Sequence, residues 1–411
     1  MVTRTSLSDA GPRGQPAPSA VATCGSIKVC YCLLERANRL RAASAEVNVL
    51  RIAMIGLPQV GKTTLFQILT HAHGSGHGAV ASKTETHVGV VAVPDARLDR
   101  LSEMYHPKKT VHASIEYLDT PGSVIELLRS GSRASASIKE VDALAHVVRA
   151  FQNDAVPPAG GEVNPRHDLD TTDLELVLSD LAVVEKRLER LSKDVKKQKS
   201  PVLEKEYQVV ERCKQALEKQ TPLREVEFSE EERRLIRGFT FLSLKPMVYV
   251  LNLDERNAAR AGAAEQFAAQ MGLAQRPRTA VTAVCGKIEA EMAELSDAEA
   301  AEFLESYGLK ESAVSRFIRT SYRLLDLISF FTVGEDECRA WTVHAGSTAL
   351  EAAGEIHSDI QKGFIRAEVV AYDDLVAAGG LAEARARGEL KLEGKEYVVR
   401  DGEVVHFRHS G

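Results

Sequence analysis

Residues 49–72 read VLRIAMIGLPQVGKTTLFQILTHA, and this stretch decides the fold of the chain. Its first part is an apolar run typical of a buried strand, and its last part has the apolar spacing of a helix. Between them, Gly56 to Thr63 match the pattern G-x-x-x-x-G-K-[ST], whose backbone N–H groups surround phosphate when it joins a strand to a helix. The sequence therefore predicts a phosphate-binding loop (P-loop) at the N-terminus of a helix.

Each part of this loop has an expected role in holding a triphosphate. The backbone amides form an anion-binding nest, and the N-terminus of the following helix adds partial positive charge. Lys62 is expected to neutralise the β and γ phosphates, which makes it a catalytic candidate, and the Thr63 hydroxyl is expected to bind Mg²⁺. The residues predicted to bind the phosphates are Gln59, Val60, Gly61, Lys62, Thr63 and Thr64.

A second motif follows the apolar strand predicted over Ala113 to Leu118. Asp119-Thr-Pro-Gly122 has the form D-x-x-G, in which the carboxylate holds Mg²⁺ through water and the glycine amide senses the γ phosphate. Asp119 is therefore a metal-binding candidate and Gly122 a catalytic one. If both motifs serve one nucleotide, Lys62 and Asp119 lie close together in the folded protein.

The residues that select the base are expected after the strand predicted over 247–251. Guanine-specific switch proteins carry N-K-x-D there, and the Asp accepts two guanine N–H groups. This chain has Asn252-Leu253-Asp254-Glu255, so Leu replaces Lys and Glu replaces Asp, which compromises guanine recognition. Asp254 in a shifted register leaves GTP open as an alternative. The predicted base-binding residues of this loop are Asn252, Leu253 and Glu255.

The loop after the next strand, predicted over 278–284, is expected to add a second base contact through Cys285 and Gly286. Cys285 is expected to be a small polar spacer rather than a nucleophile, because no histidine is close in sequence to activate it. The six cysteines of the chain show no repeated paired spacing. This favours reduced thiols in a cytosolic protein.

Strand patterns alternate with helical stretches through most of the chain, with further strands over 89–93 and 143–148. The alternation predicts an α/β fold: a doubly wound, mostly parallel P-loop NTPase sheet over residues 49–326. From residue 327 to 411, short β-rich runs surround a single predicted helix over 349–361. That arrangement is typical of a β-grasp-like domain.

Residues 168–240 interrupt the alternation with a mainly helical insertion. Apolar residues three and four apart run from Leu174 to Val195 and form one seam, and a second amphipathic helix follows a break at residues 200–201. The pattern predicts an antiparallel coiled-coil hairpin. A solvated helix end and a contact with a phosphate backbone both explain the basic tip, which contains Lys193, Lys196, Lys197 and Lys199.

Composition limits the classes of protein that remain. With 411 residues, 44% hydrophobic and 27% charged, the chain is expected to form two or three globular units. No apolar run approaches the roughly 20 residues that cross a bilayer. The formal net charge of −6 gives no global sign of nucleic-acid binding, so an RNA contact requires local basic patches. Residues 1–48 are expected to be disordered; an organelle transit peptide and a start codon assigned too early both fit them.

Seven segments spread over the chain resemble the YchF/Obg-like ATPases, a family of P-loop NTPases. The resemblance extends from about residue 50 to the C-terminus and is most specific in its last segment. The segments are GLPQVGKTTLF, VGVVAVPDARLDRL, KEVDALAHVVRAF, DLELVLSDL, KPMVYVLNLDE, KIEAEMAEL and FFTVGEDECRAWTVHAGSTALEAAGEIHSDIQKGFIRAEVVAYDDL.

This resemblance implies a G domain, an inserted helical coiled coil and a C-terminal TGS domain. The family's N-x-x-E matches Asn252 to Glu255, which implies a preference for ATP over GTP. Family members associate with ribosomes, so the implied partners are ATP and the ribosome or its RNA, contacted through the TGS domain and the helical arm. The resemblance is to cytoplasmic proteins, and a monomer that binds neither DNA nor membrane is expected.

The sequence departs from the family at both switches. Residues 123–137 replace a glycine-rich switch II, and the switch I threonine aligns with Lys83, so that the adjacent Thr84 is the candidate metal ligand. No glutamine follows Gly122, and slow ATP hydrolysis is therefore expected. The alternatives are a GTPase of the same fold and a nucleotide-binding module for the ribosome or RNA with little hydrolysis.

Overall fold

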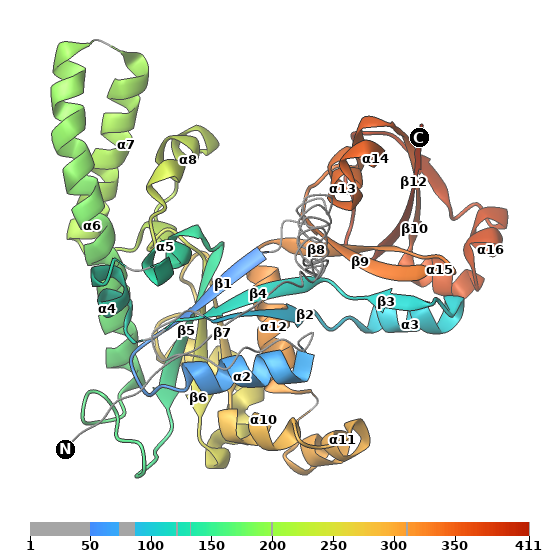
Figure 1. Ribbon diagram of the computed structural model, residues 1–411, viewed down its shortest axis with the longest axis horizontal. Coiled ribbons are helices and arrows are strands. Elements are labelled where there is room, and N and C mark those ends of the chain that lie inside the picture. Colours follow the sequence, from blue (N-terminus) through green and yellow to red (C-terminus); the bar gives the residue numbers. More distant parts are fainter. Residues whose placement is uncertain are drawn as a thin grey trace, which may run out of the picture. The chain divides into compact units, whose positions relative to one another are not determined.

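The computed structural model describes residues 50–73, 87–120, 122–131, 133–198, 200–309 and 311–410. The predictions made for residues 1–48, Thr84 and Lys199 lie outside these ranges. Within them, no helix has both the length and the apolar character of a membrane span. The described residues form two β-sheets with helices packed against them (Figure 1).

The first sheet carries the P-loop and has the strand order β2-β4-β1-β5-β6-β7. The β2–β4 pair is antiparallel and the other pairs are parallel, which confirms the predicted doubly wound, mostly parallel sheet. Because parallel strands end at the same edge, the loops after β1, β4, β5, β6 and β7 come together there. The strands are β1 (Leu50–Ile55), β2 (His87–Ala92), β4 (Ser114–Asp119), β5 (Ala143–Ala150), β6 (Met247–Leu253) and β7 (Thr279–Val284).

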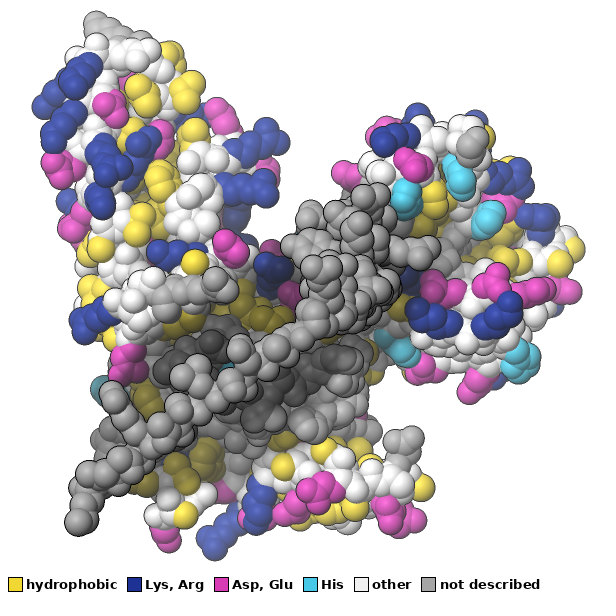
Figure 2. Space-filling view, viewed as in Figure 1, with side chains coloured by type: hydrophobic (Ala, Val, Ile, Leu, Met, Phe, Trp, Pro, Cys, Tyr) yellow, Lys and Arg dark blue, Asp and Glu magenta, His cyan; other side chains and the backbone are white. Residues whose placement is uncertain are grey.

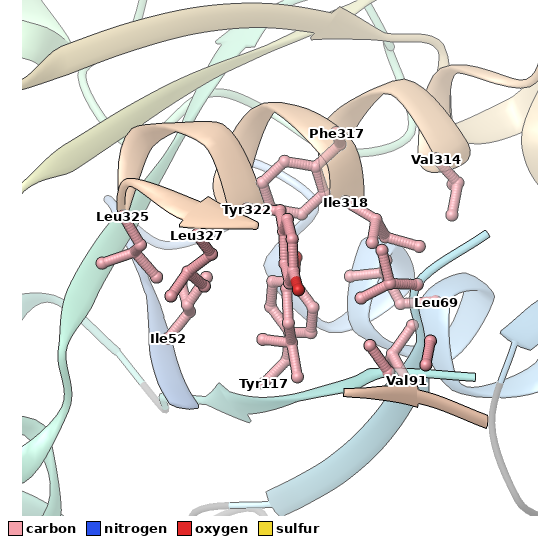
Figure 3. Packing of buried hydrophobic residues seen from close by; sticks show 14 of the residues in the cluster. Ile52, Leu69, Val91, Tyr117, Val314, Phe317, Ile318, Tyr322, Leu325 and Leu327 are labelled. Carbon is pink, nitrogen blue, oxygen red and sulfur yellow. The ribbon is translucent and has the colours of Figure 1, made fainter. Parts of the chain in front are cut away.

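Helices cover both faces of this sheet, because successive strand residues point to opposite sides and both sets are apolar. Ile52 on one face belongs to the cluster that includes α2 (Lys62–His73) and α12 (Ala313–Leu324), and Figure 3 shows Phe317 and Ile318 of α12 in it. Residues on the other face pack with α4 (Val124–Arg129), α5 (Arg133–Glu140) and α9 (Ala264–Gln270).

The insertion contains two long helices, α6 (Pro165–Lys197) and α7 (Pro201–Glu218), which lie side by side as a hairpin (Figure 1). The predicted hairpin is confirmed, and Val184 and Leu191 of its seam are buried against α7. The seam is shorter than predicted, because Leu174 is 37% exposed. This end of α6 packs on the first sheet instead, through Leu169 and Leu176. A short helix, α8 (Glu230–Ile236), follows the hairpin.

A buried charged cluster joins the insertion to the first sheet. Asp173 of α6 pairs with Arg224 of a 3₁₀ turn over Leu223–Glu225, and Arg224 is 1% exposed. Asp173 Oδ2 also accepts hydrogen bonds from Tyr249 Oη of β6 at 3.0 Å and from Arg276 Nη1 at 2.9 Å. Burial acts to raise the pKa of Asp173, but the charge of Arg224, the nearby His146 and the hydrogen bonds from Tyr249 and Arg224 together outweigh it and lower that pKa. The two segments are therefore joined by an ionised pair and not by apolar contact alone.

The second sheet has the order β11-β10-β12-β8-β9-β3. Two helices occupy the segment predicted as a single one over 349–361, because His357 is extended, with φ −166°, and ends the first. Two more helices, at 372–378 and 381–386, were not predicted. The elements are β8 (Leu327–Thr332), β9 (Glu337–His344), α13 (Ala349–Ile356), α14 (Ser358–Lys362), β10 (Phe364–Ala371), α15 (Tyr372–Ala378), α16 (Leu381–Ala386), β11 (Lys391–Glu393) and β12 (Glu403–His409).

The sixth strand of the second sheet, β3 (Lys109–Val111), comes from the segment between β2 and β4 and pairs with β9 in parallel. The helix before it, α3 (Ala96–Tyr105), is held to the same sheet. Arg97 of α3 pairs with Asp401 at 2.8 Å and lies over the Phe331 ring. The apolar core thus crosses the boundary predicted at residue 327, and the strand that ends in Asp119 is connected directly to the second sheet.

Candidate functional site

The P-loop joins β1 to α2 at the carboxyl edge of the first sheet. Gly56 and Gly61 have φ values of +141° and +98°, which favour glycine. A Cβ atom on Gly61 would also lie 2.4 Å from Asn252 Nδ2, so backbone conformation and close packing both require glycine there. Gln59 is the third residue of the loop with a positive φ, +62°.

Lys62 is the buried cation of this loop. Its side chain donates from Nζ to the carbonyl oxygens of Gly56 at 2.9 Å and Leu57 at 2.8 Å. Burial lowers the pKa of Lys62 to about 8, although the carboxylates of Asp119 and Glu126 act in the opposite direction. An ammonium group has three N–H donors, so one is left for an anion in the loop. A phosphate bound there would raise the pKa again.

Thr63 and Asp119 are in direct contact, which brings the two predicted motifs together. Thr63 Oγ1 donates to Asp119 Oδ2 at 2.8 Å. The other carboxylate oxygen, Oδ1, is buried and has no hydrogen-bond partner in the described part of the chain. Burial raises the pKa of Asp119, and the Thr63 hydrogen bond and the charge of Lys62 offset this only in part. A hydroxyl beside an unpaired carboxylate oxygen fits Mg²⁺, which prefers oxygen ligands.

The segment after β4 turns at Gly122, where φ is +67°, and enters α4. Ser123 and Glu126 form a capping box: Ser123 Oγ accepts from the Glu126 amide, and Glu126 Oε2 accepts from the Ser123 amide. Between these two residues, the Ile125 amide donates to Glu175 Oε2 of α6 at 3.2 Å. The segment that follows the predicted γ-phosphate sensor is therefore docked on the insertion.

Asn252 connects the P-loop to the loop after β7. Its Nδ2 donates to the Val60 carbonyl at 3.0 Å, and its Oδ1 accepts from the Gly286 amide at 3.1 Å. The side chain of Leu253 packs in the apolar core, with 4% of the residue exposed. Cys285 is buried as well, and burial raises the pKa of its thiol, which supports a spacer rather than a nucleophile.

The two carboxylates of the loop after β6 have separate partners. Asp254 caps a 3₁₀ helix over Glu255–Ala263, where its Oδ1 accepts from the backbone and side-chain nitrogens of Asn257 at 2.9 and 2.8 Å. This cap argues against the alternative in which Asp254 reads guanine from a shifted register. Glu255 Oε1 pairs instead with Lys287 Nζ at 2.6 Å. Lys287 is the second residue of α10 (Gly286–Met292).

Arg149, at the end of β5, is a residue of the site that the sequence analysis missed. It is 2% exposed, lies over the Phe151 ring, and donates to the carbonyl oxygens of Gln59, Phe151 and Val156. Burial lowers its pKa. The guanidinium thus joins the P-loop to the loop after β5. Its position at the carboxyl end of a predicted parallel strand was the available signal.

Two family models match the chain. One described as 50S ribosome-binding GTPase matches residues 51–210, and YchF-GTPase_C, described as a protein of unknown function (DUF933), matches residues 327–410. The ribosome-binding ATPase YchF of Bacillus subtilis (strain 168) is 44% identical over 364 residues, which is 88% of this chain and 99% of that protein. The chain belongs to the YchF family. This confirms the resemblance seen in the sequence.

Other YchF proteins extend the comparison. The ribosome-binding ATPase YchF of Pasteurella multocida (strain Pm70) is 39% identical over 88% of this chain and 99% of its own length. The solved structure of the Schizosaccharomyces pombe YchF GTPase has a TM-score of 0.75 and 29% identity, covering 88% of this chain and 98% of that one. These names contain both ATPase and GTPase, so they do not decide which base this chain binds.

Most of the predicted YchF-type site residues come together along the carboxyl edge of the first sheet. The P-loop residues, Asp119, Asn252 and Gly286 are linked by the hydrogen bonds described above. The predicted switch I ligand, Thr84, lies outside the described residues. Among the described site residues, the side chains of Leu253 and Cys285 are buried in apolar clusters.

Proposed function

We propose that this YchF-family chain is an ATP-binding switch protein that hydrolyses ATP slowly and associates with the ribosome. The observation that carries the proposal is the contact between Thr63 and Asp119 beside the buried Lys62. It joins the P-loop to the D-x-x-G motif around a carboxylate oxygen that has no hydrogen-bond partner among the described residues. The bacterial ribosome-binding ATPase YchF proteins, which align over almost their full length, support the activity and the partner.

In the proposed mechanism, Lys62 and the P-loop amides bind the β and γ phosphates and stabilise the charge that develops on their oxygens. Thr63 and Asp119 would hold Mg²⁺, which neutralises charge between the two phosphates when it is bound. The Gly122 amide responds to the γ phosphate. Ser123, which follows, caps α4 and does not replace the glutamine that orients water in other switch proteins, so turnover is slow.

Wild-type protein is expected to bind ATP more tightly than GTP when Mg²⁺ is present. Guanine N–H groups need a carboxylate acceptor, but Asp254 serves as a helix cap and Glu255 is paired with Lys287. Calorimetric titration of the same protein with each nucleotide measures the preference. Tighter binding of GTP would contradict the assignment of ATP, and the absence of binding to both would reject the proposed function.

We assign residues 49–326 to a G domain that is interrupted by the insertion at 168–240, and residues 327–411 to a TGS-type β-grasp domain. The insertion and the TGS domain are the proposed contacts with the ribosome or its RNA. The protein is proposed to act in the cytoplasm as a monomer. Exposed Lys and Arg side chains along the hairpin support an electrostatic contact with phosphate (Figure 2). They include Lys186, Arg190, Lys193, Lys196 and Lys197.

Changing Lys193, Lys196 and Lys197 together to glutamate is expected to weaken cosedimentation with ribosomes by about tenfold or more, because phosphate contacts by basic side chains dominate such binding. The measurement compares bound protein with and without ATP and Mg²⁺ over a range of salt concentrations. A control variant makes the same charge change at Arg51, Arg278 and Arg323, which are exposed and lie outside both the hairpin and the second sheet. Equal binding of the hairpin variant and wild type would reject the hairpin contact.

A further inference from the structure

An ion pair connects the two loops proposed to hold the base. Glu255 begins the 3₁₀ helix after β6, and Lys287 lies in the first turn of α10 after β7. The distance from Lys287 Nζ to Glu255 Oε1 is 2.6 Å, and the two side chains are 64% and 47% exposed. The pair therefore lies at the accessible rim of the site rather than in the core.

The polar groups beside this pair already have partners. Asn252 is held by the Val60 carbonyl and the Gly286 amide, and Asp254 is held by Asn257. Among the described residues 252–257, Glu255 is thus the carboxylate that remains for a ligand, and Lys287 is the group that engages it. The same contact raises the pKa of Lys287, which keeps its amine charged.

The two purine bases make opposite demands on such a carboxylate. The N1–H and N2–H₂ groups of guanine are adjacent donors that a free carboxylate accepts together. Adenine has no proton on N1 and offers a single donor group, N6–H₂, on that edge. A carboxylate whose charge is already compensated by an ammonium group loses much of its attraction for the guanine donors. Binding of ATP requires no such acceptor.

We propose that Lys287 is a base-selecting residue that holds Glu255 in an ion pair and so disfavours guanine nucleotides. The proposal rests on the proposed function, because it assumes that the loops after β6 and β7 receive the base. Lys287 acts through Glu255 and is therefore a positioning residue. An exposed ion pair contributes little by itself, so its removal is expected to change the ratio of affinities by about three- to fivefold.

The test is calorimetric titration of the full chain with ATP and with GTP in the presence of Mg²⁺. The variant Lys287→Ala is expected to shift the ratio of ATP to GTP affinity toward GTP, whereas Lys287→Arg keeps the ion pair and the wild-type ratio. In a Glu255→Ala background, Lys287→Ala is expected to have no further effect, because the carboxylate that it would release is gone. Lys391→Ala, at an exposed lysine of β11, controls for the loss of a positive charge.

The proposal is overturned if the ratio of ATP affinity to GTP affinity in Lys287→Ala equals the wild-type ratio or moves toward ATP. It is also overturned if Lys287→Ala shifts this ratio by the same amount when Glu255 is already alanine. A purely structural defect would weaken the binding of ATP and GTP equally and leave the ratio of affinities unchanged, and this result also overturns the proposal. These outcomes differ from a failure of the proposed function, in which wild-type protein itself binds neither nucleotide. The side chains of Lys287 and Lys391 are mostly exposed, and that of Glu255 is about half exposed.

Discussion

The variant Lys62→Ala is expected to hydrolyse ATP about 10²- to 10³-fold more slowly than wild-type protein. Lys62 places a charged donor in a buried loop, where electrostatic stabilisation of developing phosphate charge is strongest. Its removal also leaves the carbonyl oxygens of Gly56 and Leu57 without their donor, so the loop itself loses support. Release of inorganic phosphate with ATP and Mg²⁺ measures the effect.

Two controls separate this loss from unfolding and from contamination by another ATPase. Lys391→Ala removes an exposed lysine of the second sheet and is expected to hydrolyse ATP at the wild-type rate. Circular dichroism of Lys62→Ala checks that the fold is retained. Equal rates of phosphate release by Lys62→Ala and wild type would refute the hydrolase function, because a P-loop enzyme cannot keep its rate without this charge.

Replacing Asp173 by alanine is expected to lower the free energy of unfolding by about 3–5 kcal/mol, since it leaves the buried Arg224 guanidinium without a counter-ion. The loss is larger than that of an apolar contact at the same place, because Arg224 is 1% exposed and cannot reach water. Tyr249 of β6 bonds to both Asp173 and Arg224, so the pair links α6 to the first sheet. In the Asp173→Ala variant, the insertion is therefore expected to detach before the sheet unfolds. Urea unfolding followed by circular dichroism measures the change.

Matched variants distinguish charge from packing at this position. The double variant Asp173→Leu with Arg224→Met removes both charges and is expected to recover most of the stability lost in Asp173→Ala. Glu189→Gln breaks a surface pair with Lys193 and is expected to leave the unfolding midpoint unchanged. If Asp173→Ala unfolds at the wild-type midpoint, the buried pair does not hold the insertion.

The predictions from sequence succeeded where the chemistry is contiguous in the chain. The strand, loop and helix around Lys62 follow from apolar spacing and the positions of Gly and Lys within 24 residues, 49–72. The helical hairpin follows in the same way from spacing over α6 and α7. The contact between the two phosphate motifs could also be predicted from the sequence. Each motif lies at the carboxyl end of a parallel strand, and parallel strands end at the same edge of a sheet.

The predictions were incomplete where a residue's role depends on partners far away in the chain. Apolar spacing over 349–361 did not indicate the extended His357 that divides the helix. The three residues of β3, Lys109 to Val111, gave no sign that this strand joins the second sheet. Leu253 was predicted as a base-binding residue from its place in a motif, and the sequence did not indicate that its side chain packs in the core, because both faces of this strand are apolar.

By itself, the sequence determined the phosphate-binding loop, the order of the strands along the chain and the helical insertion, because each depends on neighbours within a few turns or strand lengths. Tertiary structure alone decided that Asn252 holds a carbonyl 192 residues away and that Lys287 engages Glu255. It also decided that one oxygen of Asp119 has no hydrogen-bond partner in the described part of the chain. Local patterns specify which side of an element is buried. They do not specify which distant loop meets it at the edge of the sheet, because that choice is made by the packing of the whole core.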